Sequence, residues 1–492
     1  MKQHTVTGQQ WRDLPVPALG EWEPTLRLCV VIPARDCQGD LDRTLAALSR
    51  QSYPAGLTEV LVVDDASSPP LTVPATAPAG TRVLRVDEAQ QHGSGRARDR
   101  GARSTEADIV LFLDADMVVS ATHLESHARW HHLTPHAVVL GRKRFVDFDG
   151  ITSDDVARAV AEDSLPALLD GRDSKRHSWQ EAFVKERSRL TRDVEDAFVA
   201  VVGADVSVSR ELYQRAGGFA SLGLRGIVDT EFGYRAFTSG GLIIPDWETN
   251  AYHQGARNFT TRGDEIKRER TGLAANLLPI PLFRPQNTGR QWTVPGVHVV
   301  LGTAGATPED VLITLDSVLG SEHTDLTVTL PGGDGLPQWL RDYVAADARV
   351  SVVDQAPVSG YPSPVTAQVA AGVLLDRASV GRALDLLREG GGVRAELAPG
   401  QAVTVETTRT VLRRAHSAEP DAVAGPAEIT PEQLGIRPAM YYVTAQGMLA
   451  AGERPTPPAT PPRATPKPVP ASRRVRRFLG RVKRRLRRAV GR

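Results

Sequence analysis

The first half of the chain alternates short apolar runs with amphipathic stretches. Four mostly apolar runs, bounded by polar residues, glycine or proline, predict buried strands at 26–32, 60–63, 82–86 and 109–113. Between the first two runs, leucines recur at helical spacing within 41–51, so this stretch predicts a helix. Strands that alternate with helices indicate an α/β fold with a doubly wound sheet.

Charged residues follow three of these strands. They are 35–36 (Arg-Asp), 64–65 (Asp-Asp) and the pair Asp114 and Asp116. Open α/β sheets bind their ligands at this edge, and side chains at i and i+2 of a strand face the same way. Two carboxylates on one side suit Mg²⁺ or Mn²⁺, whose open positions take diphosphate oxygens. The alternative is a solvated turn in which aspartate serves as turn former.

A glycine-rich segment precedes the fourth strand. Residues 91–98, QHGSGRAR, resemble a phosphate-binding turn that opens a helix. Arg96 and Arg100 lie one helical turn apart and are placed to reach a diphosphate; the alternative is a solvated charged face.

Length and composition set the frame for this pattern. A chain of 492 residues with 41% hydrophobic residues is long enough for two to four domains. Its two cysteines, Cys29 and Cys37, flank the first strand and indicate reduced thiols of a cytosolic protein. We expect no signal peptide in 1–13 and no transmembrane helix, because no run of about 18 apolar residues occurs.

Charge gathers at the C-terminal end. Residues 451–471 are proline-rich and predict an extended linker. Eleven of the last twenty residues are Lys or Arg and none is acidic, whereas 1–471 carry a net charge of −10. Apolar residues at helical spacing within 472–492 predict a basic amphipathic helix on an anionic membrane surface. Nucleic acid needs no apolar stripe, so we expect no nucleic-acid partner; a solvated tail is the other alternative.

The second half repeats part of this pattern. From Gly296 a strand, a loop, a helix with a leucine-rich stripe and a strand follow one another, as at the start of the first sheet. The copy ends in 331–333, Pro-Gly-Gly, where the first has its Asp pair, and no further DxD follows a buried strand. We therefore predict a degenerate, ancillary α/β domain; the alternatives are a second, distinct catalytic domain and a module that packs against the first or binds a ligand.

Six motifs in order resemble those of a known family. They are VVIPARD (30–36), VLVVDDAS (60–67), GSGRARDRGA (93–102), VLFLDADMVVS (110–120), VGADVSVSRELYQRAGGF (202–219) and VDTEFGYR (228–235). Together, over about 26–260, they resemble family 2 glycosyltransferases with the GT-A fold. The last motif resembles the catalytic "ED" segment of chondroitin-type synthases.

This resemblance implies a nucleotide-sugar site. It places Asp65 at the nucleobase, residues 33–35 along the nucleoside, and Asp114 at the ribose and the metal. The expected donor-binding residues are thus Pro33, Ala34, Arg35, Asp65, Arg96 and Asp114. Asp116 would ligate Mn²⁺ or Mg²⁺ together with Asp114, and His253 fits a late metal ligand, although a lone histidine is more often a packed or surface residue.

The resemblance also implies a base. Asp229 would take the proton from the acceptor hydroxyl in an inverting displacement. The family usually has Glu before this Asp, where this chain has Val228, so Glu231 either compensates or is itself the base. Trp179 would stack on an acceptor sugar or belong to the core, and position 205 is Asp where relatives often have Asn.

The sequence therefore predicts a GT-A, α/β enzyme with a second, smaller α/β domain. The expected segments are an arm (1–25), the transferase domain (26–260), a connector (261–295), the ancillary domain (296–450), the linker (451–471) and the basic helix (472–492). We expect a metal-dependent, inverting hexosyltransferase, cytoplasmic and peripheral to the membrane, that uses a nucleotide sugar, UDP-sugar favoured. Its acceptor would be a cell-surface or lipid-linked glycan, as in cell wall polysaccharide synthesis. The rival hypotheses are a non-catalytic nucleotide- or glycan-binding protein and, with a poorer motif, a nucleotidyltransferase.

Overall fold

The computed structural model describes residues 3–6, 8–86, 93–192, 194–222, 226–255, 263–285, 289–390, 392–443 and 449–451. Residues 1–439 form one compact unit and 440–492 a second. Of the second unit, the structure describes an antiparallel pair, β21 (Tyr441–Val443) and β22 (Leu449–Ala451). The predicted basic helix (472–492) and, apart from Ala451, the predicted linker lie outside the described residues.

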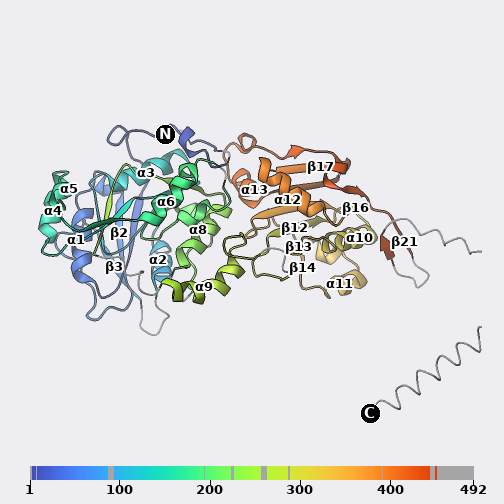
Figure 1. The fold of residues 1–492 in the computed structure, drawn as a ribbon, viewed down its shortest axis with the longest axis horizontal. Helices are drawn as coiled ribbons and strands as arrows, with labels where there is room; N and C mark the ends of the chain where they lie inside the picture. The colour runs from blue at the N-terminus through green and yellow to red at the C-terminus, as the bar shows by residue number, and fades with distance from the viewer. Residues whose placement is uncertain are drawn as a thin grey trace, which may run out of the picture. The chain divides into compact units, whose positions relative to one another are not determined.

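A seven-stranded sheet organises the first half of the chain (Figure 1). Its order is β10-β6-β9-β4-β1-β2-β3, and its strands are parallel except β9, which is antiparallel to β4 and β6. The strands are β1 (Leu28–Ala34), β2 (Thr58–Asp64), β3 (Arg82–Arg85), β4 (Ile109–Leu113), β6 (Ala137–Leu140), β9 (Asp205–Ser209) and β10 (Leu242–Pro245). The central strands are buried on both faces, so they read as continuous apolar runs.

Helices cover both faces of this sheet. One apolar core joins it to α2 (Ser94–Ala102), α7 (Arg210–Arg215), α8 (Val228–Thr238) and α9 (Gly263–Leu277). A second joins its other face to α1 (Gln38–Leu48), α4 (Ser153–Ala161) and α5 (Leu165–Leu168). On α3 (His123–Leu133), Trp130 and Leu133 pack with Trp11 of the N-terminal arm, so the predicted irregular arm contributes to the core.

A smaller four-stranded sheet stands beside the carboxyl ends of the main strands. Its order is β5-β11-β7-β8, with β5 (Met117–Val119), β11 (Ala251–Gln254), β7 (Lys143–Val146) and β8 (Ser174–Arg176). Helix α6 (Ser178–Glu186) follows β8. Because β5 starts directly after Asp116, pairing of β11 with β5 brings a distant segment to the end of β4.

A second seven-stranded sheet follows, in the order β14-β13-β12-β15-β18-β17-β19. Its strands are β12 (Val297–Gly302), β13 (Leu326–Pro331), β14 (Val350–Val353), β15 (Val365–Ala370), β17 (Gly392–Ala398), β18 (Gln401–Thr407) and β19 (Ala427–Glu428). Its helices are α10 (Pro308–Leu319), α11 (Gln338–Val344), α12 (Ser379–Gly390), α13 (Thr408–Ala415) and α14 (Pro431–Leu434). A short pair, β16 (Val373–Leu375) and β20 (Ile436–Pro438), completes this half.

The predicted strand–helix–strand order after Gly296 is confirmed, since β12, α10 and β13 follow one another and the two strands are parallel. Helix α10 begins with a capping box between Thr307 and Asp310, which fixes its first turn. Cys29 and Cys37 are both free thiols, as predicted. Among the described residues, no helix combines the length and apolar character needed to cross a bilayer.

A buried histidine makes this fold sensitive to acid. His136, directly before β6, is 3% exposed, and burial, with Arg413 and Arg215 nearby, lowers its pKa to about 3. A histidine with a lowered pKa stabilises the fold fully above its unfolded pKa of about 6.5, and this contribution is lost as the pH falls. We expect about 2 kcal/mol less free energy of unfolding at pH 5 than at pH 7 from this residue, measured by urea denaturation.

The His136→Gln variant tests that prediction. It should lose part of the pH dependence, whereas His4→Gln, which changes a half-buried histidine of the arm, should keep it. An unchanged slope between pH 5 and pH 7 in His136→Gln would show that other groups dominate acid unfolding.

Candidate active site

A cavity of about 270 Å³ opens at the carboxyl ends of β1, β2 and β4. It is lined by Pro33, Ala34, Arg35, Cys37, Asp65, Ser94, Ala97, Asp114, Ala115 and Asp116. The parallel register aligns Ala34 with Asp64, so three separate loops meet at one edge of the sheet. Five of the six expected donor-binding residues line this one cavity, and Arg96 lies half-buried on the helix beside it.

The two aspartates that end β2 have different surroundings. Asp64 accepts hydrogen bonds from the backbone of Ser67 and Leu71 and pairs with Arg85 at 2.7 Å, so it holds the loop in shape. Asp65 lines the cavity instead, and its Oδ2 accepts from the N–H of Gly93, the residue before α2. Asp65 therefore joins the second strand end to the glycine-rich turn.

The turn from Asp114 to Asp116 is fixed by helix α1 and strand β11. Thr44 of α1 donates to the carbonyl of Ala115 at 2.8 Å, and the N–H of Gln254 donates to the carbonyl of Asp116 at 2.8 Å. The side chain of Gln254 also donates to Thr44 at 3.3 Å. These hydrogen bonds fix the backbone of the turn. Both aspartate side chains are about one-third exposed and line the cavity.

His253 lies beside Asp116. Register pairing sets His253 opposite Met117, and its Nε2 lies 3.2 Å from Asp116 Oδ2. Burial, with Lys143 nearby, lowers the pKa of His253, so its imidazole is neutral and able to ligate. Burial and then the neighbouring charges of Asp114 and Asp40 raise the pKa of Asp116 to about 7.

Arg98 of α2 joins two of the expected functional carboxylates. Its Nη2 donates to Asp114 Oδ1 at 2.7 Å and its Nη1 to Asp229 Oδ1 at 3.0 Å. The Arg98 side chain is 4% exposed, against 31% for Asp114 and 34% for Asp229. Burial alone would lower the pKa of Arg98, but Asp114 and Asp229 raise it above its ordinary value, so the guanidinium stays charged.

The neighbours of Arg98 leave little space around it. A Cβ at Gly203 would lie 2.6 Å from both Arg98 Cζ and Asp229 Oδ1, so a side chain there would displace the Arg98–Asp229 pair. The ring of Phe219, which ends the motif at 202–219, lies 5.4 Å from the guanidinium. Gly203 and Phe219 of that motif therefore both help to hold the Arg98–Asp229 pair in place.

Helix α8 turns its first residues in different directions. Asp229 reaches Arg98, whereas both carboxylate oxygens of Glu231 accept from Arg235 and its side chain is buried. Val228 lies against the start of α2, where a Cβ at Gly95 would be 2.6 Å from Val228 Cγ1. Trp179 of α6 is half-buried, with its ring edge-on to His177 at 5.1 Å.

The residues at the turn fit a divalent cation. Asp116 Oδ1 is buried and makes no hydrogen bond within the described part of the chain, and Asp116 Oδ2 and His253 Nε2 face each other. A buried carboxylate oxygen that lacks a partner is costly unless a cation balances it. Carboxylate oxygen with one imidazole nitrogen is a donor set that Mn²⁺ accepts.

Comparison with known proteins supports the class of this domain. Residues 29–158 match the family model described as Glycosyl transferase family 2, which covers less than half of the chain. No curated protein sequence matches the chain. Solved structures similar to part of it include a mannosyltransferase, PcManGT from Pyrobaculum calidifontis, in complex with GDP-Man and Mn²⁺ (17% identity, TM-score 0.35, 53% of this chain and 66% of that chain).

Two further solved structures are similar to part of the chain. TarS residues 1–349 from S. aureus match at 16% identity and a TM-score of 0.34, over 52% of this chain and 68% of that one. GalNAc-T7 with UDP, GalNAc and Mn²⁺ matches at 15% identity and a TM-score of 0.34, over 50% and 48%. The chain thus spans just under two thirds of the mannosyltransferase and about half of GalNAc-T7. The family match and the mixed sheets confirm the predicted α/β, GT-A fold class, and residues 29–158 match the family 2 glycosyltransferase model.

Proposed function

We propose that this protein is a metal-dependent, inverting glycosyltransferase that moves a sugar from a nucleotide sugar to a hydroxyl group. The observation that carries the proposal is the position of Arg98. It joins Asp114, at the cavity, to Asp229, on the helix that resembles the family's catalytic segment. A donor site and a base are thereby held at a fixed separation, as direct displacement requires.

The cavity supplies the donor contacts. Pro33, Ala34 and Arg35 line one wall, and Asp65 accepts from Gly93 at another. We assign the nucleobase to Asp65 and the ribose to Asp114; Arg96, on the first turn of α2, is assigned to the diphosphate. UDP-sugar is our preferred donor.

Asp116 and His253 would hold the cation, with Asp114 beside them. When bound, Mn²⁺ or Mg²⁺ neutralises charge on the departing diphosphate. The chain itself fixes the turn through Thr44 and Gln254, so these ligands need little rearrangement to bind the cation.

Asp229 is our choice of general base. Its carboxylate is one-third exposed, and only its Oδ1 accepts from Arg98, so the second oxygen can receive the proton of an acceptor hydroxyl. Glu231 is less suited to this role, because Arg235 engages both of its oxygens. We propose a cell-surface or lipid-linked glycan as acceptor, with the basic segment 472–492 holding the protein at an anionic membrane face.

Donor binding is the first test. We expect UDP- or GDP-sugars with Mn²⁺ to raise the melting temperature of the full chain, with a smaller shift when EDTA replaces Mn²⁺. The Asp116→Asn variant should lose the Mn²⁺-dependent part of this shift, because a ligand oxygen becomes an amide. Asp170→Asn, at an exposed position, should behave as wild type. No shift with any nucleotide sugar in the presence of Mn²⁺ would overturn the proposal.

A further inference from the structure

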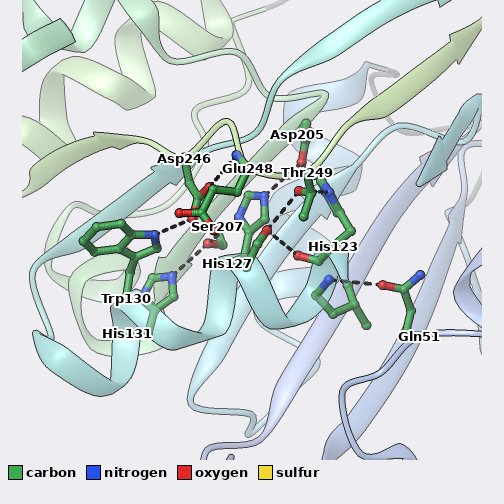
Figure 2. A network of polar contacts seen from close by, with 12 residues as sticks. Gln51, His123, His127, Trp130, His131, Asp205, Ser207, Asp246, Glu248 and Thr249 are labelled. Atoms are coloured by element: carbon green, nitrogen blue, oxygen red, sulfur yellow. Dashed lines mark hydrogen bonds and ion pairs between the residues drawn. The ribbon is translucent and has the colours of Figure 1, made fainter. Parts of the chain in front are cut away.

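A second cluster of ligand-type side chains lies behind the active site and is used by none of the steps above. His123 and His127 lie one turn apart on α3, and both rings point at Asp205, the first residue of β9 (Figure 2). His123 Nε2 is 3.0 Å and His127 Nε2 3.3 Å from Asp205 Oδ1. The three side chains are 0%, 1% and 1% exposed, so water does not solvate their charge.

The cluster contains a buried carboxylate without a strong base beside it. The ion-pair partners found for Asp205, within the part of the chain described, are these two imidazoles. A buried carboxylate needs a compensating positive charge, because an unbalanced ion in the interior costs several kcal/mol. That charge is either a proton on one histidine or a metal cation.

Two buried polar atoms of the cluster lack a hydrogen-bond partner in the described part of the chain, which supports the metal cation over the proton. Asp205 Oδ2 and His127 Nε2 are buried and make no hydrogen bond among the described residues. Gly141 flanks this oxygen, where a Cβ would lie 1.9 Å from Asp205 Oδ2. The Asp205 carboxylate therefore occupies the space that a side chain at residue 141 would fill, and its Oδ2 has no hydrogen-bond partner among the described residues.

The outer contacts of the histidines match those of metal ligands. His123 Nδ1 lies 3.1 Å from Thr249 Oγ1, and His127 Nδ1 lies 2.9 Å from Ser207 Oγ. Ligating histidines commonly donate their second ring N–H to such an oxygen, which fixes the tautomer and aims the other nitrogen at the metal. Figure 2 shows Thr249 beside His123 and Ser207 beside His127.

We propose that His123, His127 and Asp205 bind a structural zinc ion that ties α3 to β9. Bond lengths of about 2.0–2.2 Å place tetrahedral ligand atoms about 3.3 Å apart, close to the separations of 3.0 and 3.3 Å found here. Two imidazoles and one carboxylate are a zinc donor set, whereas Mg²⁺ prefers oxygen ligands.

The cluster also lies next to the turn at Asp114 that lines the candidate donor cavity. Asp205 pairs with Leu113, the residue before Asp114, and the N–H of Asp114 donates to the carbonyl of Ala204 at 3.0 Å. A cation bound to Asp205 would therefore fix the start of β9 and, with it, the preceding residues Gly203 and Ala204, which lie next to the donor turn. This inference does not depend on the proposed reaction, because its readout is metal content.

The experiment uses the full chain, produced with zinc and then treated with EDTA. Metal analysis should find about one zinc per chain in wild type and in Asp116→Asn, which lacks a donor-site ligand, but almost none in His127→Gln. If His127→Gln does not fold, the visible absorption spectrum of metal-free Asp116→Asn with added Co²⁺ tests whether the cluster binds a metal. A visible spectrum typical of four-coordinate Co²⁺, abolished by added zinc, supports the site. Zinc-free wild type that gains neither zinc nor this spectrum overturns it, and the cluster then holds a proton.

Discussion

Asp229→Asn is expected to lower the rate of sugar transfer by about 10³-fold while nucleotide-sugar binding stays close to that of wild type. Asparagine keeps the oxygen that accepts from Arg98 at 3.0 Å, so the link to Asp114 and the fold should persist. It has no basic oxygen to take the proton of the acceptor hydroxyl. Initial rates of transfer and donor titration, measured on the same preparation, separate the two effects.

Glu231→Gln is the matched control for this prediction. The amide keeps one oxygen for Arg235, so the variant should retain most of its transfer activity. A result in which Glu231→Gln is inactive and Asp229→Asn is active would move the base by two residues along α8. Wild type that binds a nucleotide sugar but neither transfers nor hydrolyses it would favour the rival hypothesis of a non-catalytic binding protein.

The apolar pattern predicted the strands better than the helices. Strand 109–113 has the predicted bounds, because both of its faces are buried and a charged residue ends it. The helix predicted at 41–51 spans Gln38–Leu48, since Ser49 ends it before the polar 50–52. The pattern missed α3, which is buried along its whole length although six of its eleven residues are ionisable: His123, Glu125, His127, Arg129, His131 and His132. Most of its polar side chains have tertiary partners, such as Asp205 for His123 and Asp246 for Arg129, that no local pattern reveals.

The positions of the candidate site residues could be predicted from the sequence where the local chain order determines them. Asp65, Asp114 and Asp116 follow strands directly, so their position at the sheet edge is a consequence of the parallel order. The place of His253 depends on β11 pairing with β5, across more than a hundred residues, and only the family resemblance pointed to it.

Arg98 could not be singled out from its charge alone, because the other two arginines of the helix, Arg96 and Arg100, lie one turn apart on a different face. Arg96 and Arg100 share one face of α2, and Arg100 is exposed. Arg98 lies on the opposite stripe with Gly95, Gly101 and Ala102, all buried. That stripe was visible in the sequence: small residues spaced three and four apart mark the side of a helix that approaches a sheet closely. A Cβ at Gly101 would lie 2.3 Å from Val31, which confirms how near α2 lies to β1.

Arg98→Met is therefore expected to affect stability and catalysis together. Methionine fills much of the volume but leaves Asp114 and Asp229 without their shared counter-charge. We expect a loss of about 3 kcal/mol in the free energy of unfolding, at the lower end for a broken buried ion pair because both carboxylates are one-third exposed. Transfer should fall at least about 100-fold, because a misplaced base and a weakened donor site act on the same step. Urea denaturation and initial rates measure the two quantities.

Arg98→Lys separates the charge of this residue from its geometry. Lysine keeps one positive charge but lacks the planar fork that donates to two carboxylates in different directions. It should recover part of the stability and less of the transfer activity, since the spacing of Asp114 and Asp229 is what the fork fixes. Arg100→Met, on the exposed face of the same helix, should leave both quantities near wild type. If Arg98→Met behaves like Arg100→Met, the donor turn and the base are positioned independently, and the linkage through α2 has no part in the reaction.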